Sequence, residues 1–249
     1  MRFVLVHGAM HGAWCWEKTT SALEALGHSA VAPDLPGHGR RQGERATLEG
    51  YRDCIVDLLE PGDVLVGHSM GGVVITLAVD AASKKVRHLI YLAPTVPKPG
   101  KGNTILDSAP RYGERGVIGG PVEGEAFWYP NIETAGERFF HDCSPEDIAW
   151  ATGQLQPQPT EPITTPITLN RFWSLATPRS LITCLVDRTS VLLLAEVAEK
   201  RLGLRTSNIM RSSHSPFISR PKYLAQLFVD VVEHHDGATP DFDLIQSSV

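Results

Sequence analysis

Ser69 stands in the sequence GHSMG, residues 67–71, which has the clearest chemical meaning of any pattern in this chain. The apolar run 64–66 precedes it, and residues 72–79 form an apolar stretch that fits a helix. A serine at a sharp turn between a strand and a helix, with glycine two positions away on each side, is typical of an exposed nucleophile. Bulky residues at position 67 or 71 would collide with the neighbouring strand and helix, so small residues are needed there. We therefore interpret Ser69 as a candidate nucleophile rather than as a chance match in a loop.

A neutral serine is a poor nucleophile, so a base must take its proton and a third group must orient that base. In an open parallel sheet, reactive side chains gather beyond the carboxyl ends of the strands. His214 comes three residues after an expected strand that ends at Arg211, and Asp187 directly follows the strand before it. We predict that His214 is the base and that Asp187 orients it, although an aspartate after a strand can also simply cap the next helix. Asp34 follows an early strand but precedes the serine in the chain, and we interpret it as a turn-stabilising residue.

An acyl-transfer site also needs two backbone N–H groups that face the developing negative charge. Met70 directly follows the nucleophile, at the expected N-terminus of a helix, where negative charge is favoured. The loop at residues 7–14 follows the first expected strand and is rich in small residues. We predict Ala9 and Met70 as the oxyanion donors, with a neighbour of Ala9 as the alternative. Gly8 and Gly12 can also be ordinary turn glycines.

The elements that must position these residues alternate in the manner of a parallel α/β sheet. Short apolar runs predict strands at 2–6, 29–32, 63–66, 86–92, 180–186 and 206–211, and amphipathic stretches predict helices at 14–26, 47–59, 70–82, 191–202 and 221–234. The strands contain successive apolar residues, which indicates that helices cover both faces of the sheet. Gly27 and the pair Pro61-Gly62 are expected to end the first two helices.

This pattern is interrupted from about residue 97 to residue 178 by a segment rich in glycine, proline and aromatic residues. Only short helices are expected there, at 133–141 and 145–152, and four prolines between 157 and 166 predict a stiff, non-helical return to the core. A long irregular insertion in an α/β domain is usually an active-site lid. We expect residues 1–96 and 179–235 to form the core, 97–178 a small cap, and 236–249 a flexible tail. Most aromatic side chains of the cap can simply pack it onto the core, but Trp128 is our candidate for lining a substrate pocket.

Composition limits the class of protein. The chain has 249 residues with 42% hydrophobic and 20% charged residues, as expected for a globular protein. A net charge of −5 without a basic cluster argues against nucleic-acid and membrane partners. The N-terminal residues lead directly into an expected strand and do not resemble a signal peptide. We therefore expect a cytoplasmic protein in which Cys15, Cys54, Cys143 and Cys184 are reduced, buried thiols without metal-ligand spacing.

Several motifs together resemble the α/β-hydrolase superfamily, and more narrowly its branch of plant methylesterases and hydroxynitrile lyases with their bacterial relatives. They are FVLVHGAMHGAWCW at 3–16, APDLPGHG at 32–39, VLVGHSMGG at 64–72, CSPEDIA at 143–149, CLVDRTS at 184–190 and HSPF at 214–217. The resemblance extends from residue 1 to about 235 and is weaker through 97–140. It implies the α/β-hydrolase fold, with a mostly parallel six-stranded sheet and a cap after the fourth strand. It also implies a triad of Ser69, Asp187 and His214, and an apolar pocket for compact esters.

The resemblance also indicates which reactions of this superfamily the chain is and is not expected to catalyse. The lyases of the branch place a lysine directly after the catalytic histidine and a threonine in the first loop, whereas this chain has Ser215, Gly8 and Ala9. Cyanohydrin cleavage is therefore disfavoured. Epoxide hydrolases and haloalkane dehalogenases attack with an aspartate, and position 69 is serine.

We accordingly predict a serine hydrolase that cleaves a small carboxylic ester through an acyl-enzyme, without a cofactor or metal. Two alternatives on the same fold stay open: a small-molecule receptor, and a biosynthetic acyl-transfer or cyclisation protein. The expected partner is a small-molecule ester, and a homodimer is left open.

Overall fold

A six-stranded sheet forms the centre of the molecule. The computed structural model describes residues 1–108, 119–120, 126–130, 132–189 and 192–234. The sheet has the order β2-β1-β3-β4-β8-β9, and all its neighbouring strands are parallel. Its strands are β1 (Arg2–Val6), β2 (Ser29–Val31), β3 (Asp63–His68), β4 (Val86–Leu92), β8 (Arg179–Cys184) and β9 (Asn208–Met210). The predicted parallel α/β sheet is confirmed, with β9 shorter than expected.

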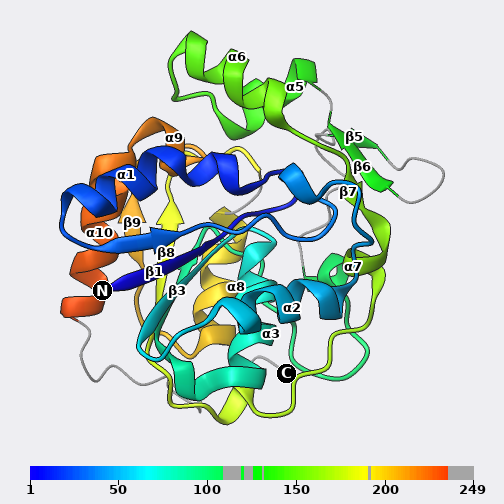
Figure 1. The fold of residues 1–249 in the computed structure, drawn as a ribbon, viewed down its shortest axis with the longest axis vertical. Coiled ribbons are helices and arrows are strands. Elements are labelled where there is room, and N and C mark those ends of the chain that lie inside the picture. Colours follow the sequence, from blue (N-terminus) through cyan, green and yellow to red (C-terminus); the bar gives the residue numbers. More distant parts are fainter. Residues whose placement is uncertain (109–118, 121–125, 131, 190–191, 235–249) are drawn as a thin grey trace.

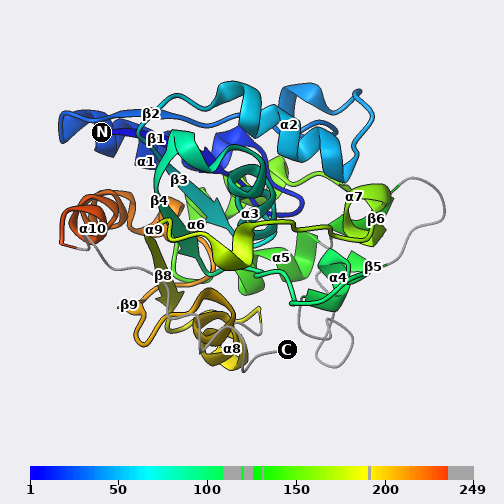
Figure 2. The ribbon, with the colours of Figure 1, turned by 90° about the horizontal axis from the view of Figure 1, so that it is seen from below.

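Helices cover both faces of this sheet, as Figures 1 and 2 show. One face carries the 3-10 helix η1 (Ala13–Trp16), α1 (Glu17–Ala25), α9 (Pro216–Ser219) and α10 (Pro221–Glu233). The other carries α2 (Leu48–Leu58), α3 (Gly71–Ala82) and α8 (Leu192–Leu202). Successive side chains of β1 point to opposite faces, so Phe3 and Leu5 join the first apolar cluster and Val4 and Val6 join the second. Burial on both faces explains why this strand is apolar from Phe3 to Val6.

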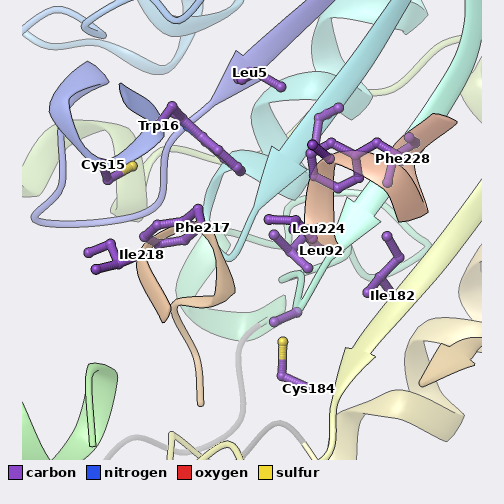
Figure 3. Packing of buried hydrophobic residues seen from close by; sticks show 14 of the residues in the cluster. Leu5, Cys15, Trp16, Leu92, Ile182, Cys184, Phe217, Ile218, Leu224 and Phe228 are labelled. Atoms are coloured by element: carbon purple, nitrogen blue, oxygen red, sulfur yellow. The ribbon is translucent and has the colours of Figure 1, made fainter. Parts of the chain in front are cut away.

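The first apolar cluster, which contains Phe3 and Leu5, also contains Trp16 of η1, just after the loop that follows β1. Trp16 is fully buried, and its ring lies 5.0 Å from that of Phe217 between ring centroids (Figure 3). Phe228 of α10 stacks on Phe3 of β1 with centroids 6.3 Å apart. Aromatic burial of this kind dominates the packing energy of a core. The short helix η1 is therefore attached to the core, and with it the loop that precedes it.

Local signals in the sequence set the helix ends. The side chain of Thr47 accepts a hydrogen bond from the Gly50 N–H at the start of α2. Gly27 adopts a positive φ of 81° just beyond α1, and Gly62 one of 90° beyond α2. The left-handed conformation of Gly27, directly after the C-cap Leu26, favours glycine and confirms the predicted end of α1. The helix α2 ends at Leu58 with the extended Leu59 as its cap, so Gly62 lies in the turn before β3 rather than at the helix end.

A smaller set of elements follows β4. It consists of α4 (Ile105–Ser108), β5 (Gly119–Gly120), β6 (Ala126–Pro130), α5 (Ile132–Phe139), α6 (Pro145–Gln154), β7 (Gln158–Pro159), α7 (Thr160–Thr164) and η4 (Phe172–Ser174). β5, β6 and β7 form a three-stranded antiparallel sheet. In Figure 1, α5 and α6 lie beyond the end of the main sheet toward which the arrow of β8 points. The two short helices thus lie at the carboxyl ends of the strands.

The return segment differs from the prediction in one respect. Residues 160–164 form a helical turn, although four prolines between 157 and 166 predicted a non-helical path. Pro162 is the third residue of α7. The first N–H groups of a helix have no intrahelical partner, so a proline there costs no hydrogen bond.

Other expectations concern single features. All four cysteines are among the described residues and are free, with Cys15 and Cys184 buried and Cys54 and Cys143 only half-buried.

No helix in the described ranges is both long and apolar enough to span a bilayer. The expected tail, 236–249, lies outside the described residues. Two further short 3-10 helices, η2 (Gly39–Arg41) and η3 (Ser83–Lys85), complete the connections between core elements.

Candidate active site

Ser69 occupies the sharp turn between β3 and α3. Its backbone φ is +51°, a conformation that few residues other than glycine adopt. The end of β4 supports this turn, because the Ser69 N–H donates to the carbonyl of Leu92 over 3.1 Å and the Ser69 carbonyl accepts from Thr95 over 2.8 Å. The Ser69 carbonyl also accepts from the N–H of Gly72, at 2.9 Å. The neighbouring strand and the helix therefore hold the strained turn in place.

The two glycines of the motif leave no room for a side chain. A Cβ atom on Gly67 would lie 2.5 Å from the carbonyl oxygen of Gly71, and one on Gly71 would lie 2.6 Å from that of Val6. Both neighbours are backbone atoms that cannot move aside without shifting a whole element. The steric reason inferred from the sequence is confirmed for both positions.

Asp187 and His214 meet beyond the ends of β8 and β9. Oδ2 of Asp187 lies 2.6 Å from Nδ1 of His214, and both side chains are buried. A neutral imidazole that faces a carboxylate through Nδ1 carries its proton there, so its Nε2 is left as the basic nitrogen. The structure thus brings together two of the three residues of the predicted relay in the geometry that such a relay requires.

Thr189 completes the environment of the carboxylate. Its N–H and its hydroxyl both donate to Oδ1 of Asp187, over 2.7 Å and 2.6 Å. Burial raises the pKa of Asp187, but the charge of His214 and the hydrogen bonds from His214 and Thr189 outweigh it, so the pKa stays below its ordinary value. Asp187 is therefore ionised at neutral pH and stabilises a positive charge on His214.

His68 connects this pair to the turn at Ser69. Its Nε2 lies 2.9 Å from the carbonyl oxygen of His214, and the two imidazole rings are 4.5 Å apart between centroids. Burial lowers the pKa of His68 well below its ordinary value, so the ring is neutral. Because His68 directly precedes Ser69, this contact places His214 beside the turn that carries the candidate nucleophile. The prediction that His68 packs near the turn is confirmed.

The loop after β1 approaches the same turn. A Cβ atom on Gly8 would lie 2.9 Å from Cβ of Ser69, so glycine permits a close approach of the two backbones. Ala9 follows directly, and Met70 opens α3 with helical backbone angles of −51° and −34°. Among the described residues, no hydrogen bond uses the N–H of Ala9 or of Met70 as its donor. Both amides are thus available to a ligand, and the N-terminus of α3 adds a favourable dipole for negative charge.

The cap covers the imidazole. Phe139, the last residue of α5, stacks on the ring of His214 with centroids 5.5 Å apart. The same phenyl ring meets His11 of the first loop edge-on at 5.4 Å. Trp128, predicted to line the pocket, lies in β6, and its side chain is outside the described part of the chain.

Sequence reasoning missed Thr189 and Phe139. Thr189 had a local signal, since a hydroxyl residue two positions after an aspartate often donates to that carboxylate. Phe139 had none, because its contact with His214 spans elements that are far apart in the chain. No group of three or more metal-ligating side chains is present within the described ranges.

Together these groups can carry acyl transfer. The candidate nucleophile sits on a strained turn, the residue before it contacts His214, which an ionised carboxylate orients, and the N–H groups of Ala9 and Met70 have no hydrogen-bond acceptor among the described residues. An ester carbonyl bound between them would be attacked on one side and would have its developing oxyanion stabilised on the other.

Comparisons with known proteins show which proteins this chain is similar to. The family model described as "Alpha/beta hydrolase family" matches residues 3–227. The probable esterase PIR7A of Oryza sativa is 27% identical over 260 residues, which cover 94% of this chain and 97% of that protein. A crystal structure of a methylesterase from Arabidopsis superposes with a TM-score of 0.76 at 25% identity, covering 94% of this chain and 99% of that one. A pyrethroid hydrolase from Sphingobium faniae JZ-2 also superposes with a TM-score of 0.76, at 28% identity over 94% of this chain and 97% of that one.

Proposed function

The chain belongs to the alpha/beta hydrolase family and is a carboxylic ester hydrolase, and on this premise we propose that it cleaves small esters through an acyl-enzyme on Ser69. The observation that carries the proposal is the 2.6 Å contact between Asp187 and His214, which His68 connects to the turn at Ser69. A histidine oriented in this way is suited to remove the serine proton.

The proposed reaction has two halves. Oγ of Ser69 attacks the ester carbonyl while Nε2 of His214 takes its proton, and the N–H groups of Ala9 and Met70 stabilise the oxyanion. His214 then protonates the leaving alcohol. In the second half, His214 removes a proton from water, the resulting hydroxide attacks the acyl-enzyme, and Ser69 leaves with that proton. Asp187 stabilises the imidazolium at each stage.

The chemistry around the base favours hydrolysis over cyanohydrin cleavage. Ser215 follows His214 and is fully buried, so this position offers no cation to a departing cyanide. We propose compact aryl or methyl esters as the substrate class, by analogy with the methylesterase and esterase relatives.

The Ser69→Ala variant tests the proposal. Against a set of small aryl and methyl esters, we expect kcat to fall by a factor of about 10⁴ or more, with KM changed only a few-fold. Ser21→Ala is the matched control, because Ser21 is an exposed serine whose hydroxyl contacts only the Glu17 carbonyl. Near wild-type turnover by Ser69→Ala would overturn the assignment.

A second measurement separates an esterase from the other functions of this fold. We expect a fluorophosphonate to label the wild-type protein but not Ser69→Ala, and the wild-type protein to turn over a short p-nitrophenyl ester. Labelling without turnover would contradict hydrolysis and would favour a receptor or a specialised transferase.

A further inference from the structure

The peptide group between Ala9 and Met10 is held at both ends. Nδ1 of His11 donates to the carbonyl oxygen of Ala9 over 2.8 Å, and the N–H of Met10 donates to Oε1 of Gln158 over 3.4 Å. Burial lowers the pKa of His11 to about 3, so its ring is neutral and Nδ1 carries a proton. The orientation of this peptide thus depends on one residue of the loop and one residue of the cap.

Met10 needs such support because its backbone φ is +62°. A residue other than glycine keeps this conformation only when its surroundings impose it. The return segment, residues 156–158, supplies two of the contacts. The Gln156 N–H donates to the Met10 carbonyl over 2.9 Å, and the side chain of Gln158 accepts from the Met10 N–H. Residues almost 150 positions away therefore determine the path of the first loop.

Gln158 is itself firmly oriented. It is fully buried, and its Nε2 donates to the hydroxyl of Tyr51 and to the carbonyl of Pro159, both over 3.2 Å. The hydroxyl of Tyr51 lies 2.9 Å from Nε2 of His38 in the same network. With Nε2 engaged in this way, Oε1 must face Met10, so the amide cannot turn without losing several hydrogen bonds.

We propose that Gln158 is a positioning residue for the oxyanion hole, through which the return segment of the cap orients the N–H of Ala9. The inference rests on the proposed function, in which Ala9 is an oxyanion donor. The Ala9–Met10 peptide is separated from the Ala9 N–H by a single Cα atom. A displacement of that peptide would move the Cα atom of Ala9 and, with it, the Ala9 N–H relative to Ser69. Gln158 would thus affect the transition state, where the oxyanion exists, more than substrate binding.

The first test compares Gln158→Met with Gln158→Glu. Methionine fills a similar volume but cannot accept from Met10, and we expect kcat to fall about tenfold with KM changed less than twofold. The loss is limited because the contacts from His11 and Gln156 remain. Glutamate should restore most of kcat, since burial raises its pKa and the neutral carboxyl group can still accept from Met10.

The matched control is Gln154→Met, in an exposed glutamine at the end of α6, which should keep wild-type kcat. Tyr51→Phe tests for a merely structural role, because it removes a partner of Nε2 and leaves the acceptor toward Met10 in place. Equal losses of kcat in Tyr51→Phe and Gln158→Met, at equal losses of thermal stability, would show that Gln158 only stabilises the fold and would overturn the proposal.

The second test does not depend on activity. Hydrogen exchange of the Met10 amide should be at least tenfold faster in Gln158→Met than in the wild-type protein and in Gln154→Met. Unchanged exchange together with unchanged kcat would contradict the proposal. If Ser69→Ala kept its activity, the proposed function would fail, but the exchange experiment would still decide whether Gln158 restrains the loop.

Discussion

At the scale of single residues, the carboxylate of Asp187 shows how a buried charge is kept ionised. One oxygen faces His214, and the other accepts both the N–H and the hydroxyl of Thr189. Hydrogen bonds to the charged form lower the pKa of a carboxyl group, whereas burial raises it. Because the hydroxyl of Thr189 also lies 3.2 Å from Nδ1 of His214, this threonine contacts both partners of the pair.

Replacing this hydroxyl should weaken the pair. In Thr189→Val the backbone N–H remains, but the carboxylate loses one donor, so we expect the pKa of Asp187 to rise and kcat to fall about tenfold. Thr189→Ser should recover most of kcat. Wild-type kcat in Thr189→Val would show that the hydroxyl is dispensable for catalysis.

The same substitution should shift acid unfolding. The ionised carboxylate stabilises the fold above its unfolded pKa of about 3.9, and this contribution is lost as the pH falls through the lower folded pKa. Raising the folded pKa moves that loss to higher pH, so Thr189→Val should unfold at a higher pH than the wild-type protein. Urea unfolding between pH 3 and pH 7 measures the shift, with Thr164→Val, an exposed threonine, as the control.

At the scale of elements, the nucleophile turn depends on how closely β1, β3 and α3 approach one another. The glycines at 67 and 71 allow contacts to backbone oxygens that a side chain would prevent, and Gly72 does the same where α3 passes the carbonyl of Thr95. The strained φ of Ser69 is a consequence of this packing, since hydrogen bonds from both neighbouring segments hold its backbone. The turn is therefore a property of three elements rather than of five residues.

A pair of glycine substitutions tests this view. Gly71→Ala would place Cβ 2.6 Å from the carbonyl oxygen of Val6, and we expect a loss of about 3 kcal/mol or more in the free energy of unfolding, together with lost activity. In α6, Gly153→Ala has no atom within 4 Å of the new Cβ, and should gain up to about 1 kcal/mol from helix propensity. Denaturant unfolding measures the free energy of unfolding of both variants, and equal values would contradict the steric argument.

At the scale of the whole molecule, several buried histidines lie between the sheet, the first loop and the cap. Burial lowers the pKa of His7 to about 4 and that of His11 to about 3, and it lowers the pKa values of His38 and His68 well below the ordinary range. Each ring is therefore neutral in the folded protein at neutral pH. Protonation of these rings is therefore unfavourable in the folded protein.

This arrangement predicts a loss of stability on mild acidification. Unfolded histidine titrates near pH 6.5, so below that pH the unfolded chain binds more protons than the folded one, and the free energy of unfolding falls with pH. Each histidine contributes a slope of up to about 1.4 kcal/mol per pH unit, and the effect continues until its folded pKa is reached. We expect a loss of several kcal/mol between pH 7 and pH 5, measured by urea unfolding.

Two substitutions test whether buried histidine rings cause this loss of stability. His38→Gln should reduce the slope by up to about 1.4 kcal/mol per pH unit, because one proton fewer is taken up on unfolding. His234→Gln, in an exposed histidine at the end of α10, is the control. A free energy of unfolding that stayed constant from pH 7 to pH 5 would be inconsistent with neutral, buried histidines.

The sequence by itself determined the features that depend on neighbouring residues. Apolar runs predicted all six strands of the main sheet, and the glycines around Ser69 predicted the turn and its steric cause. Gly27 predicted the end of α1 through its backbone conformation. The positions of Asp187 and His214 after late strands predicted that they would meet, because parallel strands end at the same edge of a sheet.

The tertiary structure alone decided which side chains support the site. Phe139 stacks on His214 from the cap, and Gln158 reaches Met10 across 148 positions of the chain. The return segment also contains the helical turn α7, which its prolines argued against. Periodicity and the small residues that a sharp turn requires can be read along the chain. Contacts between distant residues depend on how the cap folds back over the first loop, and that is decided by packing across the whole molecule.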